Sequence, residues 1–367
     1  MKGAGIIFAL ILILLANSCI NEFEPEIAET TPILVVEGLL TDQQVPNKVK
    51  LSSSMMPGEV LVPVPVTGAH VRIQDDQGNT HMLTENEPGC YYTNPAAFKG
   101  IPGRKYALFI DSYLGDCASP YCEMVAVPPI DSVYYEKVLI KTNEMGLPVE
   151  GCQIYVDTHD ETDSTRFFRW DYTETWIFRL PYDVPNNTCW RTSGSDRIYL
   201  ANTTYLAESR ISRFPLIKIP TETDDRLQEK YSVLVNQYSL NEDEFRYWEK
   251  IEKIAQQSGG LYDVTPMTIE GNIRRLEDPS EKVLGYFSVS AISSQRIFIK
   301  DTFKGFKDPY RSCPYETLPI YRAVPGIGET YWVIIWDYDL QIKVITDQLR
   351  CVDCTTRGSI EKPDFWP

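Results

Sequence analysis

The residues of this chain with the most obvious chemical potential are its nine cysteines. One of them, Cys19, follows an apolar run near the N-terminus, which leaves an even number in the rest of the chain. An even number in an exported protein favours structural disulfides, although the sequence does not choose among the pairings. The spacing of Cys351 and Cys354 also fits a redox or zinc motif. However, no second close pair completes a zinc site, and the tail does not resemble the helix start of a redox pair. We therefore predict four disulfides, no metal site and no cofactor, with these candidates: Cys90, Cys117, Cys122, Cys152, Cys189, Cys313, Cys351 and Cys354.

Cys19 is a candidate for lipidation. The run from Ile6 to Ala16 has the length of a signal-peptide core and is too short to span a bilayer. Asn17 and Ser18 separate it from the cysteine, and small or polar residues at this place resemble a bacterial lipobox. We therefore expect a signal peptide at residues 1–18, cleavage before Cys19 and lipid anchoring through its thiol. The alternative is an ordinary secreted protein in which Cys19 is incidental.

The segment after Cys19 is acidic. Residues 20–29 hold four acidic residues and no basic one, so we expect residues 19–30 to form an extended, solvated tether. Such acidity after a lipidated cysteine also resembles the surface-export signal of Bacteroidota lipoproteins; a plain charged linker is the alternative. The whole chain has a net charge of −16, and removing the leader with its Lys2 gives −17. This balance argues against nucleic acid as a partner.

Catalytic motifs are scarce. The three histidines do not form a metalloprotease motif, and no nucleophile elbow, phosphate-binding loop or dinucleotide fingerprint is present. Acidic residues are densest at residues 157–163 and 221–225. Paired carboxylates there would suit a glycosidase, but solvated loops in an acidic protein give the same pattern. We therefore assign no catalytic residue.

Short alternating apolar segments with frequent turn signals predict a mainly β protein. Their spacing favours two antiparallel β-sandwich domains of immunoglobulin or fibronectin type. Val127-Pro128-Pro129-Ile130 marks the boundary between an N-terminal β-sandwich domain at residues 31–128 and a C-terminal β-rich domain at residues 129–367.

The C-terminal region contains two distinctive patterns. Large aromatic residues alternate along residues 168–178, which predicts the buried face of a strand; a stacking platform for a sugar or a haem-like ligand is the alternative. Ser239 and Glu242 have the spacing of a capping box, and an apolar stripe of Phe245, Trp248, Ile251 and Ala255 follows. We therefore predict one α-helix inserted at about residues 240–257.

Several segments, in this order, resemble the Bacteroidota lipoproteins of the domain of unknown function 4249 family. They are Cys19, residues 23–25, 34–41, 128–135, 237–240, 248–250, 271–273, 284–287, 351–354 and 362–366. The family carries no catalytic motif that maps onto this chain. The resemblance implies an outer-membrane context shared with TonB-dependent receptors.

These observations favour a non-enzymatic protein, lipid-anchored to the outer membrane, that binds a ligand or a receptor and assists nutrient uptake. The membrane and a TonB-dependent receptor are the expected partners, and the ligand is left open. A surface hydrolase using loop carboxylates is the first alternative. A structural envelope or adhesin component is the second.

Overall fold

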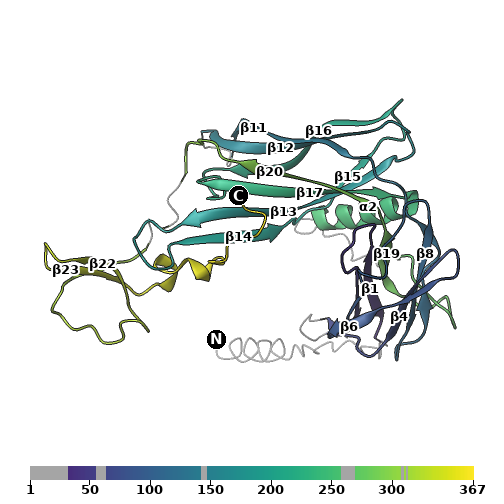
Figure 1. The fold of residues 1–367 in the computed structure, drawn as a ribbon, viewed down its shortest axis with the longest axis horizontal. Coiled ribbons are helices and arrows are strands. Elements are labelled where there is room, and N and C mark those ends of the chain that lie inside the picture. The colour runs from purple at the N-terminus through teal and green to yellow at the C-terminus, as the bar shows by residue number, and fades with distance from the viewer. Residues whose placement is uncertain (1–31, 55–62, 142–146, 258–268, 307–309, 311–312) are drawn as a thin grey trace, which may run out of the picture.

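The structure, a computed structural model, describes residues 32–54, 63–141, 147–257, 269–306, 310 and 313–367. Over these ranges the chain is mainly β with one α-helix, which confirms the predicted class. Figure 1 shows an elongated molecule whose early strands gather at one end and whose last strands lie at the other. Within the described ranges, no helix combines the length and the apolar composition needed to cross a bilayer. The expected leader and tether lie outside these ranges.

A first core lies between two sheets built largely from the early part of the chain. Its strands are β1 (Leu34–Leu40), β2 (Lys48–Ser53), β3 (Val64–Pro65), β4 (His70–Asp75), β5 (Thr80–Met82), β6 (Thr84–Glu87), β7 (Cys90–Tyr92), β8 (Lys105–Asp111), β9 (Cys117–Ala118), β10 (Cys122–Glu123), β18 (Arg274–Arg275) and β19 (Leu284–Val289). One sheet has the order β19-β1-β2-β7-β6, with β3 on β2, and the other has the order β18-β9-β8-β4-β5, with β10 on β8. Inward residues alternate as the sequence pattern predicts.

Two strands of this first core come from much later in the chain. β19 pairs with β1 in parallel, with Val36 opposite Gly285, and β18 pairs with β9. Gly285 has a φ of +90°, and a Cβ there would lie 1.9 Å from the backbone oxygen of Val36, so the close approach requires glycine. Both strands fall within residues 129–367, where the sequence predicted a C-terminal domain and antiparallel pairing. Periodicity identifies a strand, but it does not reveal which sheet the strand joins.

A second core lies between two further sheets. Its strands are β11 (Ile130–Ile140), β12 (Val149–Asp160), β13 (Phe167–Arg179), β14 (Thr188–Gly194), β15 (Tyr199–Asn202), β16 (Ser209–Pro220), β17 (Lys230–Leu240) and β20 (Ile292–Ile299). The sheet orders are β11-β12-β16 and β14-β13-β17-β20, with β15 on β13. The aromatic stripe of β13 faces this core, and Phe168 and Trp170 are at most 1% exposed. The stripe is therefore part of the core and does not offer a stacking platform.

The helix α2 (Glu242–Gln257) follows β17 directly. Asn241 is its cap, because the side-chain Oδ1 accepts a hydrogen bond from the backbone N of Glu244 at 2.9 Å. The predicted capping box of Ser239 and Glu242 is wrong. Ser239 belongs to β17, and its hydroxyl donates to the backbone oxygen of Val125.

The helix packs where the two cores meet (Figure 1). Phe245 is buried and Trp248 partly buried in a small cluster that includes Leu39 of β1 and Phe167 of β13. The ring of Tyr247 also stacks on Tyr286 of β19 at 4.6 Å. The first two members of the apolar stripe therefore pack against the protein itself.

A third, small sheet forms near the C-terminus. It contains β21 (Glu316–Pro319), β22 (Trp332–Asp337) and β23 (Ile342–Thr346) in the order β21-β23-β22. Two short 3-10 helices follow, at Leu349–Cys351 and Cys354–Thr356. The final residues return to the second core, where Trp366 is 6% exposed and packs edge-on against Phe298 of β20.

Candidate functional site

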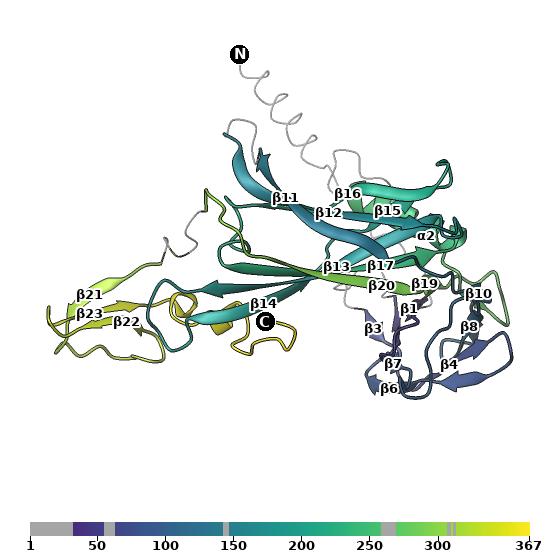
Figure 2. The same ribbon diagram turned by 45° about the horizontal axis from the view of Figure 1, so that its top comes forward.

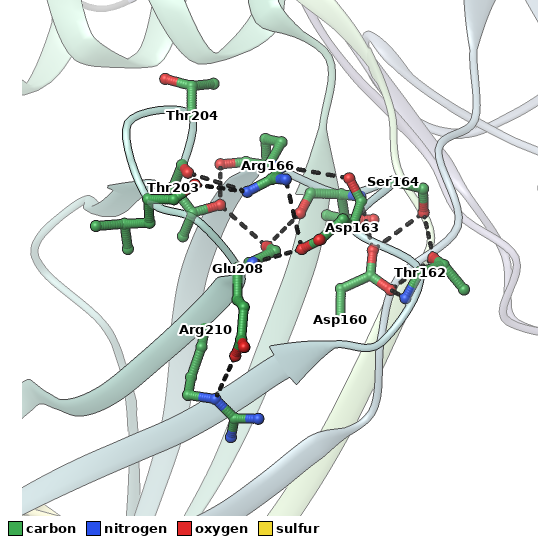
Figure 3. Close-up of polar contacts among 12 residues, drawn as sticks. Asp160, Thr162, Asp163, Ser164, Arg166, Thr203, Thr204, Glu208 and Arg210 are labelled. Carbon is green, nitrogen blue, oxygen red and sulfur yellow. Dashed lines mark hydrogen bonds and ion pairs between the residues drawn. The ribbon is translucent and has the colours of Figure 1, made fainter.

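The acid-rich segment after β12 forms a tight turn. Asp160 accepts hydrogen bonds from the backbone N and the hydroxyl of Thr162, at 2.9 and 2.7 Å (Figure 3). It also accepts from the hydroxyl of Ser164 at 3.0 Å and from the backbone N of Thr165 at 2.7 Å. Burial alone would raise the pKa of Asp160, but these hydrogen bonds outweigh it and lower the pKa to about 2. The Asp160 carboxylate therefore stabilises the turn through these hydrogen bonds.

Arg166 ties this turn to the loop before β16 (Figure 3). Its Nη2 lies 3.4 Å from Oδ1 of Asp163, and its Nη1 donates to the backbone oxygens of Thr203 and Leu206 at 3.2 and 3.3 Å. The same Asp163 oxygen accepts from the backbone N of Ser209 at 2.6 Å. The carboxylates of Asp160 and Asp163 thus hold two loops together. They do not support the glycosidase alternative.

The second acid-rich segment pairs with arginines. Asp224 accepts from Nε of Arg226 at 2.6 Å, and Asp225 accepts from Nη2 of Arg357 at 2.7 Å. The Arg357 guanidinium also lies over the ring of Phe178 at 4.7 Å. Asp225 therefore fastens the C-terminal segment to the second core.

A buried carboxylate that the sequence analysis did not single out lies within the aromatic stripe. The side chain of Glu174 is 6% exposed, and it accepts hydrogen bonds from Arg226 at 2.7 and 2.8 Å. The hydroxyl of Tyr231 donates to the same carboxylate at 2.7 Å. Burial lowers the pKa of Arg226, but the two carboxylates of Asp224 and Glu174 outweigh burial and raise it. A charge at an inward strand position was the available signal, but spacing does not identify a partner 52 residues away.

Glu174 and Arg226 line an open cleft at the edge between the two sheets of the second core. The cleft has a volume of about 660 Å³, with β16 on one side and the β14–β15 connection on the other. This volume is within the range of about 300–1,000 Å³ typical of small-molecule sites. Two exposed cations, Arg197 and Lys218, line it from opposite sides, and neither forms an ion pair within the described ranges.

The cleft is lined by fixed polar groups and by exposed charges. Its buried charges already satisfy one another, so Glu174 and Arg226 are held in place and do not offer a free base. Burial raises the pKa of Tyr172, another lining residue, which keeps its hydroxyl neutral. The exposed cations supply charge, and the buried groups supply a fixed polar wall. This arrangement suits reversible capture of a small polar molecule.

The cysteines divide into two groups. Cys189 pairs with Cys354 and Cys313 pairs with Cys351, so the tail cysteines are held by structural bridges as predicted. The prediction of four disulfides is wrong, because four cysteines are unbonded and buried: Cys90, Cys117, Cys122 and Cys152. They lie in four different strands, β7, β9, β10 and β12. The even count suggested full pairing, but it carries no information on which cysteines lie close together.

Two of the unbonded thiols are held in their unreactive, protonated form. Burial raises the pKa of Cys122 to about 11 and that of Cys152 to about 12, which suppresses the reactive thiolate. Across the part of the chain that the structure describes, no three histidine, cysteine or acidic residues gather as metal ligands. Cys19, the lipidation candidate, lies outside the described residues.

The comparisons with known proteins agree with the resemblance noted from the sequence. No curated protein matches the chain. Residues 20–296 match the family model described as Domain of unknown function (DUF4249). The match begins directly after Cys19, covers the first core with its late strands β18 and β19, and ends within β20 of the second core. This chain therefore belongs to the DUF4249 family.

Proposed function

We propose that this protein is a lipid-anchored binding protein of the bacterial outer membrane. It acts without catalysis, beside a TonB-dependent receptor, in nutrient uptake. The observation that carries the proposal is the cleft of the second core. Its buried Glu174 and Arg226 bind each other, whereas the side chains of Arg197 and Lys218 are available to bind a ligand. Pre-formed clefts with a few placed polar groups are typical of ligand sites.

The N-terminal sequence supports the anchoring part of the proposal. A short apolar core, Cys19 and an acidic tether follow one another within the first 30 residues. A lipid at Cys19 and a tether of about 12 residues would keep the first core within roughly 40 Å of the membrane, at about 3.3–3.6 Å per extended residue. A ligand captured in the cleft would then be held close to a receptor in the same membrane.

Two measurements test the proposal. Tagged full-length protein, extracted from outer membranes in mild detergent, should co-purify with a TonB-dependent receptor, whereas an unrelated tagged lipoprotein should not. Calorimetry of the purified protein against pools of small polar nutrients should detect a binder. Arg197→Gln and Lys218→Gln should weaken its binding, while the matched exposed variant Lys282→Gln should not.

The proposal fails if the wild-type protein fractionates as soluble, or if no receptor is enriched above the lipoprotein control. Turnover of a bound compound would point to the hydrolase alternative. Binding that is unchanged in both cleft variants would place the ligand elsewhere on the molecule.

A further inference from the structure

Exposed apolar side chains concentrate on the third sheet and its connections. Seven of the 22 large apolar residues that are exposed within the described ranges lie between residues 315 and 340. We call this region the aromatic tip, and its members are Tyr315, Tyr321, Ile327, Ile335, Trp336, Tyr338 and Leu340. Strand alternation places Ile335 on one face of β22 and Trp336 on the other. Monomeric proteins rarely leave such a group uncovered, and tyrosine and tryptophan are enriched where proteins meet.

The aromatic tip is held in a defined shape. The rings of Trp336 and Tyr338 are stacked with their centroids 6.5 Å apart. Asp337 shapes the turn between β22 and β23, because its Oδ1 accepts from the backbone N of Asp339 at 3.1 Å and of Leu340 at 2.9 Å. The Cys313–Cys351 disulfide joins the segments on either side of the sheet. A surface ordered in advance loses less entropy when a partner binds.

The charges around the aromatic tip are unbalanced. Four exposed carboxylates have no ion-pair partner within the described residues: Glu316, Glu329, Asp339 and Asp347. Of the two basic residues between positions 313 and 348, Lys343 is only 3% exposed. Its Nζ donates to the backbone oxygen of Arg322 and lies 5.6 Å from the ring centroid of Trp336. Arg322 is exposed, so the accessible charges of this region are four carboxylates against one guanidinium, and the region is acidic on balance.

This charge pattern selects among the occupants that an apolar surface could have. A second copy of the chain would bring the same excess of acidic charge, and an anionic lipid surface would also repel it. A protein that presents apolar side chains ringed by lysine and arginine matches both features. Figures 1 and 2 both place the third sheet at the far end of the molecule from β1, the first described strand after the tether.

We propose that the aromatic tip is the docking surface for a protein partner with an apolar centre and a basic rim. The partner's membership of the receptor class rests on the proposed function, whereas its surface chemistry follows from the aromatic tip alone. Trp336 and Tyr338 supply the buried centre of the interface, as aromatic residues do at interaction hot spots. The exposed carboxylates orient the partner and accelerate its association.

The experiment is site-specific photo-crosslinking in the full-length, lipidated protein in cells. Tyr338→p-benzoylphenylalanine should give an adduct with one protein, and the crosslinked peptide should carry lysine or arginine beside apolar residues. The same substitution at Tyr205, which is 93% exposed and outside the third sheet, should not give that adduct. Asp339→Lys, whose side chain makes no described contact, should reduce the adduct at least about fivefold by charge repulsion. Trp336→Ala should reduce it as well, with the melting temperature as the folding control.

Several outcomes would overturn the inference. An adduct of twice the chain mass would mean self-association, and an adduct with lipid alone would mean a membrane contact. No adduct, an equal adduct from Tyr205, or an adduct that Asp339→Lys leaves unchanged would remove the docking surface. If the partner is not a TonB-dependent receptor, this inference stands and the proposed function fails. If a receptor co-purifies equally with wild type and Trp336→Ala, the proposed function stands and this inference fails.

Discussion

Glu244 of α2 is a buried carboxylate at the junction of the two cores. It is fully buried, and its Oε1 lies 3.4 Å from Nε1 of Trp248 and 3.5 Å from the hydroxyl of Ser290, while its Oε2 has no hydrogen-bond partner. The nearest cation is Arg169 of β13, whose guanidinium lies between the rings of Tyr238 and Trp248 at 4.2 and 4.6 Å. Burial raises the pKa of Glu244, and the hydrogen bonds and Arg169 only partly oppose it.

Glu244→Gln removes this charge while keeping the shape of the side chain. A buried polar group without a partner costs about 1–3 kcal/mol, and more when it is charged. We therefore expect the variant to be about 1–3 kcal/mol more stable than wild type at alkaline pH. The sign follows from proton binding: the folded state holds the Glu244 proton more tightly than the unfolded chain, where the glutamate pKa is about 4.3. The stability from Glu244 is complete below that value and is lost as pH rises through the raised folded pKa.

The assay is the difference in melting temperature between Glu244→Gln and wild type from about pH 4.5 to 8.5. The difference should be small at the acidic end and grow by several degrees with pH. Carboxylates with lowered pKa values, such as Asp160, titrate in both proteins and cancel in the difference. Glu249→Gln, a partly exposed position on the same helix, should give a flat difference. A constant difference for Glu244→Gln, or a variant less stable at every pH, would refute the reasoning.

The remaining predictions concern the anchor, the thiols and two packing positions. Cys19→Ser should move the protein from the membrane fraction to the soluble fraction or leave the leader uncut, and alkyne-palmitate labelling should be lost with it. Thiol titration of a variant lacking Cys19 should find no reactive thiol in the native protein and four thiols after denaturation. Mass spectrometry should find the remaining four cysteines in two disulfides. Trp248→Ala should destabilise the protein by roughly 3 kcal/mol, seen as a lower melting temperature. Gly285→Ala should cost at least about 2 kcal/mol by the same measurement, because its Cβ meets the β1 backbone.

The fold was predictable wherever the signal was local. The alternation in β13 and the apolar stripe of α2 both report one element packing on one core, and both were correctly identified. The predicted cap was wrong because Asn241 and Glu244 repeat the spacing of Ser239 and Glu242, so two capping patterns overlap in this segment. Ser239 pairs with Phe168 between β13 and β17, so it belongs to the sheet and the helix begins after it. Local sequence offered both solutions, and only the tertiary pairing chose between them.

The candidate site could not be predicted from the sequence, for a related reason. Dense carboxylates drew attention to residues 157–163 and 221–225, but density mostly reflects turns and ion pairs within loops. The cleft instead depends on single residues from separate strands, and their partnership exists only once the sheets face each other. An isolated Glu174 among buried aromatics was the more informative anomaly, since a buried charge requires a partner somewhere in the fold.

The two disulfides gather beside the third sheet. Three of the four unbonded thiols lie in the two large cores, Cys117 and Cys122 in the first and Cys152 in the second. The third sheet has only three short strands, which is the minimum for a sheet to be stable by itself. Both disulfides end in the tail beside this sheet: Cys313–Cys351 closes the segment that contains it, and Cys189–Cys354 fixes that segment to β14. Covalent links therefore replace the missing core where the aromatic tip projects, which lets the molecule keep apolar side chains on the surface without losing the sheet that carries them.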